Sequence, residues 1–255
     1  MDLYSVSMET IQLPLFSQLK KYYPGYKHHG GRYHNNHLIW LIGCDRKQLL
    51  KDTSALRLSY SLNKIEGKHS LGKELIRLSK YGKDSVTGRD GLQYIYHPIA
   101  YGPYLADKYG YPSVSKLHQL YPKDTKKKFW GKQGILRVIT YTKHSNLPKG
   151  HVALWDCNHF HQSKDWIAKH SLITVEFWES PDSNCTGHDI AMETKKFPQQ
   201  NEVLNTWQRI KALGKYKPHH RQFNAVLPDY QTNVHIRHAK HRGFSNFARL
   251  AKSGV

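Results

Sequence analysis

The order of helix-like and strand-like patterns along the chain constrains its fold more than any other feature. A helix is expected over residues 52–66, where apolar side chains recur at helical spacing and Asp52 or Thr53 can cap the first turn. A second helix is expected over residues 71–81. Runs of β-branched and aromatic residues predict strands at 134–142, 151–155, 159–162 and 172–178. Helices that precede strands predict an α+β domain, with helices packed on an antiparallel sheet.

The composition changes near residue 190, which divides the chain of 255 residues into two parts. The first part, 1–190, holds the expected elements, and hydrophobic residues make up 38% of the chain, enough for a packed core. Gly and Pro interrupt this part, for example at Gly102-Pro103, where a turn is expected. From Phe197 onward Gln, Asn, Lys and His predominate, with a helical stretch near 202–213. The second part, 191–255, is therefore interpreted as a basic C-terminal extension.

The chain is strongly basic, with 39 Lys and Arg against 19 Asp and Glu and a formal net charge of +20. This charge favours polyanionic partners, such as nucleic acid, anionic lipid or bacterial wall polymers. Nucleic acid is the less expected partner, because no helix-turn-helix, zinc-finger or RNA-binding signature accompanies the charge. No run approaches the roughly 18 apolar residues of a membrane span. Residues 1–12 lack the pattern of a secretory signal.

Three cysteines occur, Cys44, Cys157 and Cys185, and they allow either one disulfide with one remaining thiol or three reduced thiols. No Cys-x-x-Cys pair is present, which argues against a zinc site built from thiolates. Histidines gather in residues 28–37, but their spacing is irregular and no acidic residue accompanies them. We therefore expect neither a metal ion nor a cofactor.

Two segments carry residues suited to nucleophilic catalysis. In residues 52–63, Asp-Thr-Ser-Ala-Leu-Arg-Leu-Ser-Tyr-Ser-Leu-Asn, Ser54 falls at the first turn of the expected helix. Unpaired backbone N–H groups and the helix dipole favour negative charge there, so a thiol at this position would have a lowered pKa. In residues 150–156, Gly-His-Val-Ala-Leu-Trp-Asp, His151 opens the expected strand. A nucleophile at a helix start, followed about a hundred residues later by a histidine at a strand start, is the chain order of papain-like hydrolases.

These segments resemble the motifs of the fourth family of type VI secretion amidase effectors, in the NlpC-type branch of papain-like peptidoglycan hydrolases. Family members show a Thr-Cys-Ala-x-Arg-x-Ser-Tyr-x-Leu-Asn helix and a Gly-His-x-x-Leu-Trp-Asn/Asp strand. The matching residues are Thr53, Ala55, Arg57, Ser59, Tyr60, Leu62 and Asn63 in the helix, and Gly150, His151, Leu154, Trp155 and Asp156 in the strand. The resemblance spans roughly residues 40–160. Two motifs in the right order and at the right separation make it fairly specific.

The resemblance implies a papain-like α+β fold for residues 1–190 and a peptidoglycan amidase activity. The implied scissile bond is the amide between D-glutamate and meso-diaminopimelate in the stem peptide. The resemblance also implies a secreted antibacterial effector that acts on the bacterial wall or in the target periplasm, with an immunity protein as a partner. His151 is the implied base, and Ser54 occupies the nucleophile position. A different class of function is a non-catalytic basic protein that binds wall polymer or nucleic acid.

The serine at position 54 departs from the family, whose nucleophile is a cysteine. The pKa of a serine hydroxyl lies far above the range that a helix dipole can correct, so the hydroxyl needs stronger assistance from a base. Three interpretations stay open: an engineered Cys-to-Ser change that gives an inert protein, a natural binding protein that has lost its nucleophile, and a working serine enzyme. Cys44, ten residues earlier, is a further candidate thiol.

The third member of the site is ambiguous in the sequence. The family's acidic partner lies about eleven residues after the histidine, and Gln162 occupies that position here. A turn after the strand would also bring residues 161–163 opposite His151. Asp165 is the nearest carboxylate, and His161 would correspond to the Cys-His-His variant of related hydrolases. We expect Gln162 to orient His151, with Asp165 as the second candidate.

Overall fold

The computed structural model describes residues 10–44, 52–78, 82–119, 122–140, 149–168, 170 and 172–188. The extension predicted for 191–255, with its helical stretch, lies outside these described residues, so the division of the chain near residue 190 stays a prediction. No helix in the described part is both long and apolar enough to cross a membrane.

A five-stranded antiparallel sheet forms the centre of the described domain, with the strand order β3-β7-β4-β5-β6. Its strands are β3 (Val114–Gln119), β4 (Lys132–Thr140), β5 (Lys149–Cys157), β6 (His159–Phe160) and β7 (Ile173–Glu179). The central strand β4 pairs with β5 and β7, so that Val138 lies opposite both His151 and Val175. Strand β6 pairs with β5 at Trp155 and Asp156, near the end of that strand. The strands expected from the sequence are confirmed as β4, β5, β6 and β7.

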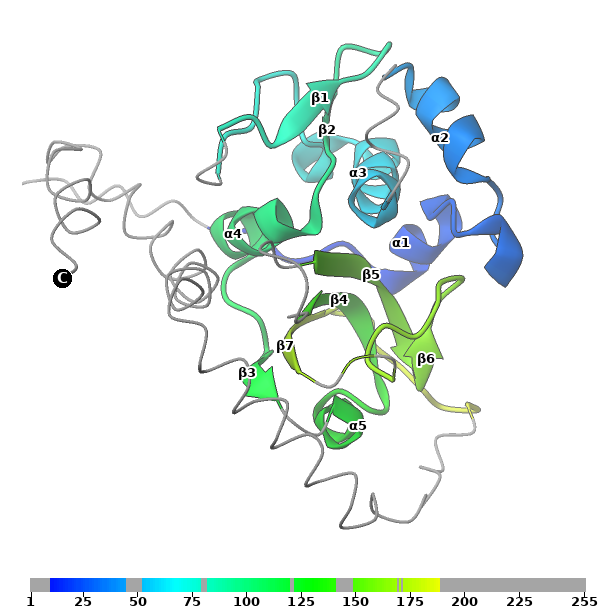
Figure 1. The fold of residues 1–255 in the computed structure, drawn as a ribbon, viewed down its shortest axis with the longest axis vertical. Coiled ribbons are helices and arrows are strands. Elements are labelled where there is room, and N and C mark those ends of the chain that lie inside the picture. Colours follow the sequence, from blue (N-terminus) through cyan, green and yellow to red (C-terminus); the bar gives the residue numbers. More distant parts are fainter. Residues whose placement is uncertain are drawn as a thin grey trace, which may run out of the picture.

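Helices cover both faces of this sheet. Figure 1 shows α3 and α4 on one side of the sheet and the short α5 on the other. The helices are α1 (Phe16–Tyr22), α2 (Asn35–Ile42), α3 (Ser54–Ile65), α4 (Pro98–Tyr109) and α5 (Pro122–Thr125), with 3-10 turns η1 (Lys27–His29), η3 (Gly67–His69) and η4 (Lys126–Lys128). A two-stranded sheet of β1 (Ser85–Thr87) and β2 (Gln93–Ile95) packs beside α3. The α+β architecture predicted from the sequence is confirmed.

Helix α3 packs its apolar side against β5, and this packing positions the candidate site. The shared cluster includes Ala55, Leu58, Leu62, Val152 and Leu154, all of them fully buried. Each such Leu or Val contributes about 1.5–3 kcal/mol when it leaves water. The opposite face of the sheet packs in a separate cluster around Trp155 and Phe129. Because α3 and β5 are held together along their lengths, the start of the helix meets the start of the strand.

The second expected helix, at residues 71–81, is wrong for its described part, because residues 71–78 are irregular. Side chains from elsewhere accept from backbone N–H groups of this segment, and one of these donors, Ile76 N, would be used internally by a helix that starts at residue 71. Asn63 Oδ1 accepts from Leu71 N at 2.8 Å, and Ser85 Oγ accepts from Ile76 N at 3.0 Å. Gly72 has a φ of 74°, which also ends any helical turn there. Tertiary hydrogen bonds therefore override the helical pattern.

The turn expected at Gly102-Pro103 is also wrong, because α4 continues through both residues. Pro103 has no N–H to donate to the carbonyl of Ile99, four residues earlier. Arg137 of β4 supplies the missing donor, since its Nη2 lies 2.8 Å from Ile99 O. Gly102 leaves room for this guanidinium, because a Cβ there would lie 2.5 Å from Arg137 Nη1. The helix therefore tolerates the proline.

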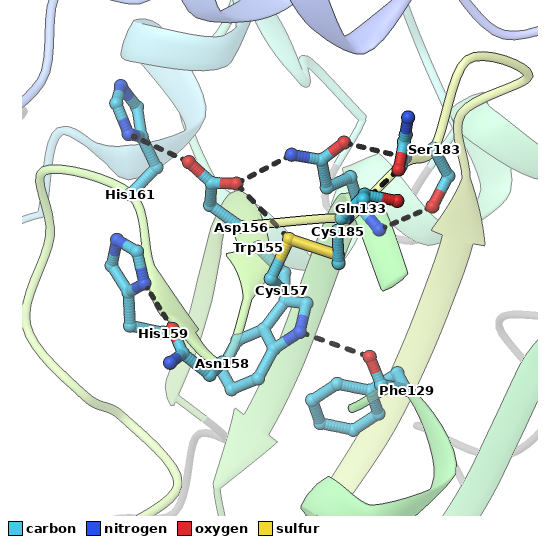
Figure 2. The surroundings of a disulfide bond; sticks show 12 residues. Phe129, Gln133, Trp155, Asp156, Cys157, Asn158, His159, His161, Ser183 and Cys185 are labelled. Carbon is cyan, nitrogen blue, oxygen red and sulfur yellow. Dashed lines mark hydrogen bonds and ion pairs between the residues drawn. A yellow bond between two sulfur atoms is a disulfide. The ribbon is translucent and has the colours of Figure 1, made fainter. Parts of the chain in front are cut away.

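A disulfide joins Cys157, at the end of β5, to Cys185 in the segment after β7 (Figure 2). Hydrogen bonds hold the same segment beside β4. Gln133 N donates to Ser183 Oγ at 2.8 Å, and Asn184 N donates to Gln133 Oε1 at 3.0 Å. The structure therefore has the disulfide arrangement, one of the two that the sequence left open.

Candidate active site

Ser54 is the first residue of α3 and is fully buried. Its Oγ accepts a hydrogen bond from the Val152 amide at 3.3 Å, which places the hydroxyl against β5, next to His151 in the chain. Its backbone N–H donates to Asp52 Oδ1 at 2.8 Å. Asp52 rather than Thr53 therefore satisfies the first N–H of the helix, since the Thr53 side chain makes no capping bond.

His151 lies near the start of β5 and is also fully buried. Its Nε2 is 2.7 Å from Ser163 Oγ. Trp166 stacks against the imidazole, with ring centroids 4.9 Å apart and an interplanar angle of 8°. Tyr26 also stacks on it, with centroids 6.1 Å apart and an angle of 27°. These contacts fix the plane of the ring.

The other ring nitrogen of His151, Nδ1, is buried without a hydrogen-bond partner among the described residues. An unsatisfied buried polar atom costs about 1–3 kcal/mol, so this nitrogen calls for an explanation, and a role as a base supplies one. Burial lowers the pKa of His151 well below 6.5, and the charges of Lys164, Arg57 and His29 lower it further. The imidazole is therefore neutral near pH 7. When Nε2 carries the proton and donates to Ser163, Nδ1 holds the lone pair that a base needs.

Asp52 faces the same helix start and is half-buried. Burial raises the pKa of its carboxyl, while hydrogen bonds from the Ser54 backbone and hydroxyl act in the opposite direction. The Ser54 N–H, which would otherwise face an oxyanion, therefore already has an acceptor. A substrate that uses this N–H must first displace the Asp52 carboxylate.

Arg57 fastens the loop of residues 24–35 to the start of α3. Its buried guanidinium donates to two backbone carbonyls of that loop, those of Gly25 and Tyr33. The same group lies over the Tyr26 ring, 4.0 Å from its centroid. Because Tyr26 stacks on the imidazole, Arg57 supports the site through this packing.

The Ser163 hydroxyl occupies the place on His151 where Gln162 or Asp165 was expected. Of the region 161–163, which a turn after the strand was expected to bring opposite the histidine, Ser163 makes the contact. A single serine in a loop carries no signal of its own, so only the turn geometry could have found this residue. Trp166 and Tyr26 were likewise missed, because aromatic residues that hold a site look like core residues in a sequence.

Gln162 and Asp165 make other contacts. Gln162 packs against Gly25, where an added Cβ would lie 2.2 Å from Gln162 Oε1. Asp165 pairs with Lys126 and accepts from Ile167 N at 2.9 Å. Neither contact involves the imidazole.

Two other residues considered from the sequence also lie elsewhere. His161 faces Asp156, with Nδ1 3.8 Å from Oδ2. Cys44 is buried in a cluster with side chains of α2, β1 and β2 and with Leu56 of α3, and Ser54 itself is the first residue of α3, so Cys44 does not take its place there.

No family model and no curated protein matches the sequence. Among solved structures, the chain is similar to the type VI effector Tae4 from Enterobacter cloacae, with a TM-score of 0.51 and 18% sequence identity. The match covers 68% of this chain and 99% of that one. This chain shares the Tae4 fold. The papain-like α+β fold predicted from the sequence is thereby confirmed. The Tae4–Tai4 effector–immunity complex from Salmonella Typhimurium gives a TM-score of 0.48 at 22% identity, over 67% of this chain and 100% of that one.

On the Tae4 fold, this chain places a hydroxyl at a helix start against the strand that carries a neutral, oriented imidazole with one open nitrogen. A base and a nucleophile position so placed suit acyl transfer from an amide. The hydroxyl, however, is engaged with the Val152 amide and with Asp52. The geometry therefore gives a base and a nucleophile position whose hydroxyl already has partners.

Proposed function

We propose that this chain has the site of a Cys-His type peptidoglycan amidase, with serine at the nucleophile position. The observation that carries the proposal is the junction of α3 and β5, where Ser54 Oγ contacts the strand and His151 Nδ1 is open. The matching helix and strand motifs and the shared Tae4 fold support it. With Ser54 in place, we expect the chain to bind stem peptides and to cleave them very slowly or not at all.

With cysteine at position 54, the start of α3 would lower the thiol pKa, and His151 Nδ1 would take the proton. The thiolate would attack the carbonyl carbon of the amide between D-glutamate and meso-diaminopimelate. The C–N bond would break as His151 returns the proton to the leaving amine, and water would then hydrolyse the thioester. The N–H of residue 54, once released by Asp52, would stabilise the oxyanion. A serine hydroxyl would have to go through the same reaction steps, but it is much less acidic than a thiol and so gives up its proton less readily.

The biological setting that we propose is an antibacterial effector acting on the wall in the target periplasm. The formal net charge of +20 supports an anionic wall polymer as the target. The motif resemblance also implies an immunity protein that protects the producing cell.

The proposal is tested by digesting purified peptidoglycan with the Ser54→Cys protein and resolving the fragments by mass spectrometry. We expect Ser54→Cys to release fragments with a new meso-diaminopimelate amine, and the unchanged chain to release few or none. The matched control Ser54→Cys/His151→Ala keeps the thiol and removes the base, so it should be inactive. A folded Ser54→Cys protein that releases no fragments would contradict the amidase assignment.

A second candidate function is a non-catalytic protein that binds an anionic polymer. The observation in its favour is the Ser54 hydroxyl, which bonds to Val152 and Asp52 rather than to the imidazole. This function predicts that Ser54→Cys leaves the polymer uncut, while reversing the charges in residues 235–252 abolishes binding. Binding to nucleic acid and to wall polymer would both weaken with salt, so competition between the two polymers is needed to separate them.

A further inference from the structure

The turn from β5 to β6 carries a buried carboxylate and two imidazoles that the proposed chemistry does not use. Asp156 and His159 lie directly opposite each other in the antiparallel pair, so their side chains share one face. His161, two residues beyond His159, joins them. One ligand atom from each of the three residues lies within 4.8 Å of the others. Figure 2 shows both rings on the same side of the carboxylate.

The two oxygens of the Asp156 carboxylate face different groups. Its Oδ1 accepts from Gln133 Nε2 at 2.7 Å, and the side chain is 2% exposed. Its Oδ2 faces His161 Nδ1 at 3.8 Å, too far for a hydrogen bond. Two ligands bound at about 2.0–2.2 Å to a tetrahedral Zn²⁺ ion lie about 3.4 Å apart, so a small closure of this gap would let both bind one ion.

His159 is oriented in the way that metal-binding histidines are. Its Nδ1 is 2.7 Å from Asn158 Oδ1, an acceptor that fixes the proton on Nδ1 and leaves the lone pair on Nε2. The amide of Asn158 thus plays for His159 the orienting part that Gln133 plays for Asp156.

A cation already occupies this position in the structure. Lys20 Nζ lies 2.8 Å from Asp156 Oδ2, and the Lys20 side chain is 44% exposed. The Asp156 carboxylate is buried whereas the ammonium is reached by solvent, so Lys20 can leave at low cost only when another cation takes its place. The Asp156 carboxylate then lies beside the two imidazoles, each with a ligand atom within 4.8 Å of it.

We propose that Asp156, His159 and His161 form a binding site for a divalent transition-metal ion of the Zn²⁺ class, in exchange for Lys20. The donor set of two imidazoles and one carboxylate suits such an ion and leaves a fourth position for water. Metal binding would clamp the β5–β6 turn, which leads directly into Ser163, the residue on His151. The site is separate from the proposed nucleophile and base, so the inference does not depend on the amidase function.

The test is a titration of the full oxidised chain with Zn²⁺ alone, followed by calorimetry. We expect His159→Ala and His161→Ala to weaken one binding step at least about tenfold, and Lys20→Met to tighten that step. His34→Ala is the matched control, because His34 belongs to the other histidine cluster and should leave the step unchanged. The chain has 18 histidines, so the comparison is made step by step rather than on total zinc bound.

Thermal unfolding provides the second readout, since an ion that binds the folded state raises its melting temperature. Zn²⁺ should raise the melting temperature of the unchanged chain and of His34→Ala, but not that of His159→Ala. The His159 side chain is exposed, so its removal should not disturb the fold. Equal zinc affinity in the unchanged chain and His159→Ala, or weaker binding in Lys20→Met, would overturn the proposal.

Discussion

At the scale of single residues, the orientation of His151 depends on the Ser163 hydroxyl, 2.7 Å from Nε2. Removing it leaves a buried nitrogen unsatisfied, which costs about 1–3 kcal/mol, or roughly ten- to hundredfold in rate if the loss falls on the transition state. On the Ser54→Cys background, Ser163→Ala should therefore lower kcat by about that factor, with little change in KM. Steady-state kinetics on a soluble stem peptide measures both.

The control for this prediction is Gln162→Ala on the same background, because Gln162 packs on Gly25. It should change kcat less than Ser163→Ala does. Ser163→Thr keeps the hydroxyl and should restore most of the rate. If Gln162→Ala is the more damaging change, the family position holds the orienting residue after all, and the role assigned to Ser163 is wrong.

The depressed pKa of His151 links its burial to the pH dependence of stability. The unfolded chain protonates this histidine below about pH 6.5, whereas the folded chain does not, so unfolding takes up a proton there. The stability that the folded chain gains by keeping His151 neutral is fully present above pH 6.5. As the pH falls below 6.5 toward the folded pKa, the free energy of unfolding decreases by up to about 1.4 kcal/mol per pH unit. His161, with a pKa lowered to about 4, adds to the same decline.

Urea unfolding at pH 7, 6 and 5 tests this link. The free energy of unfolding should fall with acidification in the unchanged chain and fall less steeply in His151→Asn. The comparison uses slopes, so a uniform loss of stability in the variant does not affect it. Parallel slopes would show that His151 titrates normally in the folded protein.

At the scale of elements, the sequence patterns that identify α3 and β4 to β7 succeed because local and tertiary preferences agree. In α3 the apolar spacing matches the face that packs on β5. A local sequence pattern predicts the wrong structure where a residue far along the chain changes which conformation is stable. Arg137 donates to the carbonyl that Pro103 leaves open, so a proline that signals a turn sits inside α4. No pattern within residues 98–109 could reveal that donor.

The residues of the candidate site likewise fall into those that the sequence could predict and those that it could not. Ser54 and His151 were predictable because each sits at the start of an element with a recognisable pattern. Ser163, Trp166 and Tyr26 lie in loops or at their ends, and their positions depend on how those loops cross β5. The sequence could place the region of the third residue through the turn after β5, but not the side chain that fills it.

The disulfide gives a prediction at this scale, because it closes a loop of 28 residues between β5 and the segment after β7. Loop-closure entropy for that length corresponds to about 3–4 kcal/mol. Reduction should therefore lower the free energy of unfolding by roughly this amount, as measured by urea unfolding with and without a phosphine reductant. The loss should persist in Cys44→Ala and vanish in Cys157→Ala/Cys185→Ala. A stability indifferent to reductant would mean that the two cysteines are not paired in solution.

At the scale of the whole molecule, the charge is spread over both parts of the chain. Residues 191–255 carry 12 Lys and Arg against 3 Asp and Glu, so the extension alone does not account for the net +20. A basic domain and a basic extension can both contribute to attraction by an anionic wall, since the field of the whole protein raises the rate of encounter. The two contributions are separated by removing one of them.

Truncation after Asp189 on the Ser54→Cys background makes that separation. If the extension serves targeting, the shortened protein keeps its melting temperature and its turnover of a soluble stem peptide, because neither depends on residues 191–255. Its affinity for intact sacculi should fall several-fold, and the deficit should be larger at low salt, where exposed charges are least screened. Co-sedimentation with sacculi across a salt series measures both effects. If Trp207, Phe223 and Tyr230 instead anchor the extension on the domain, the truncated chain will melt earlier or aggregate, and targeting will not be its role.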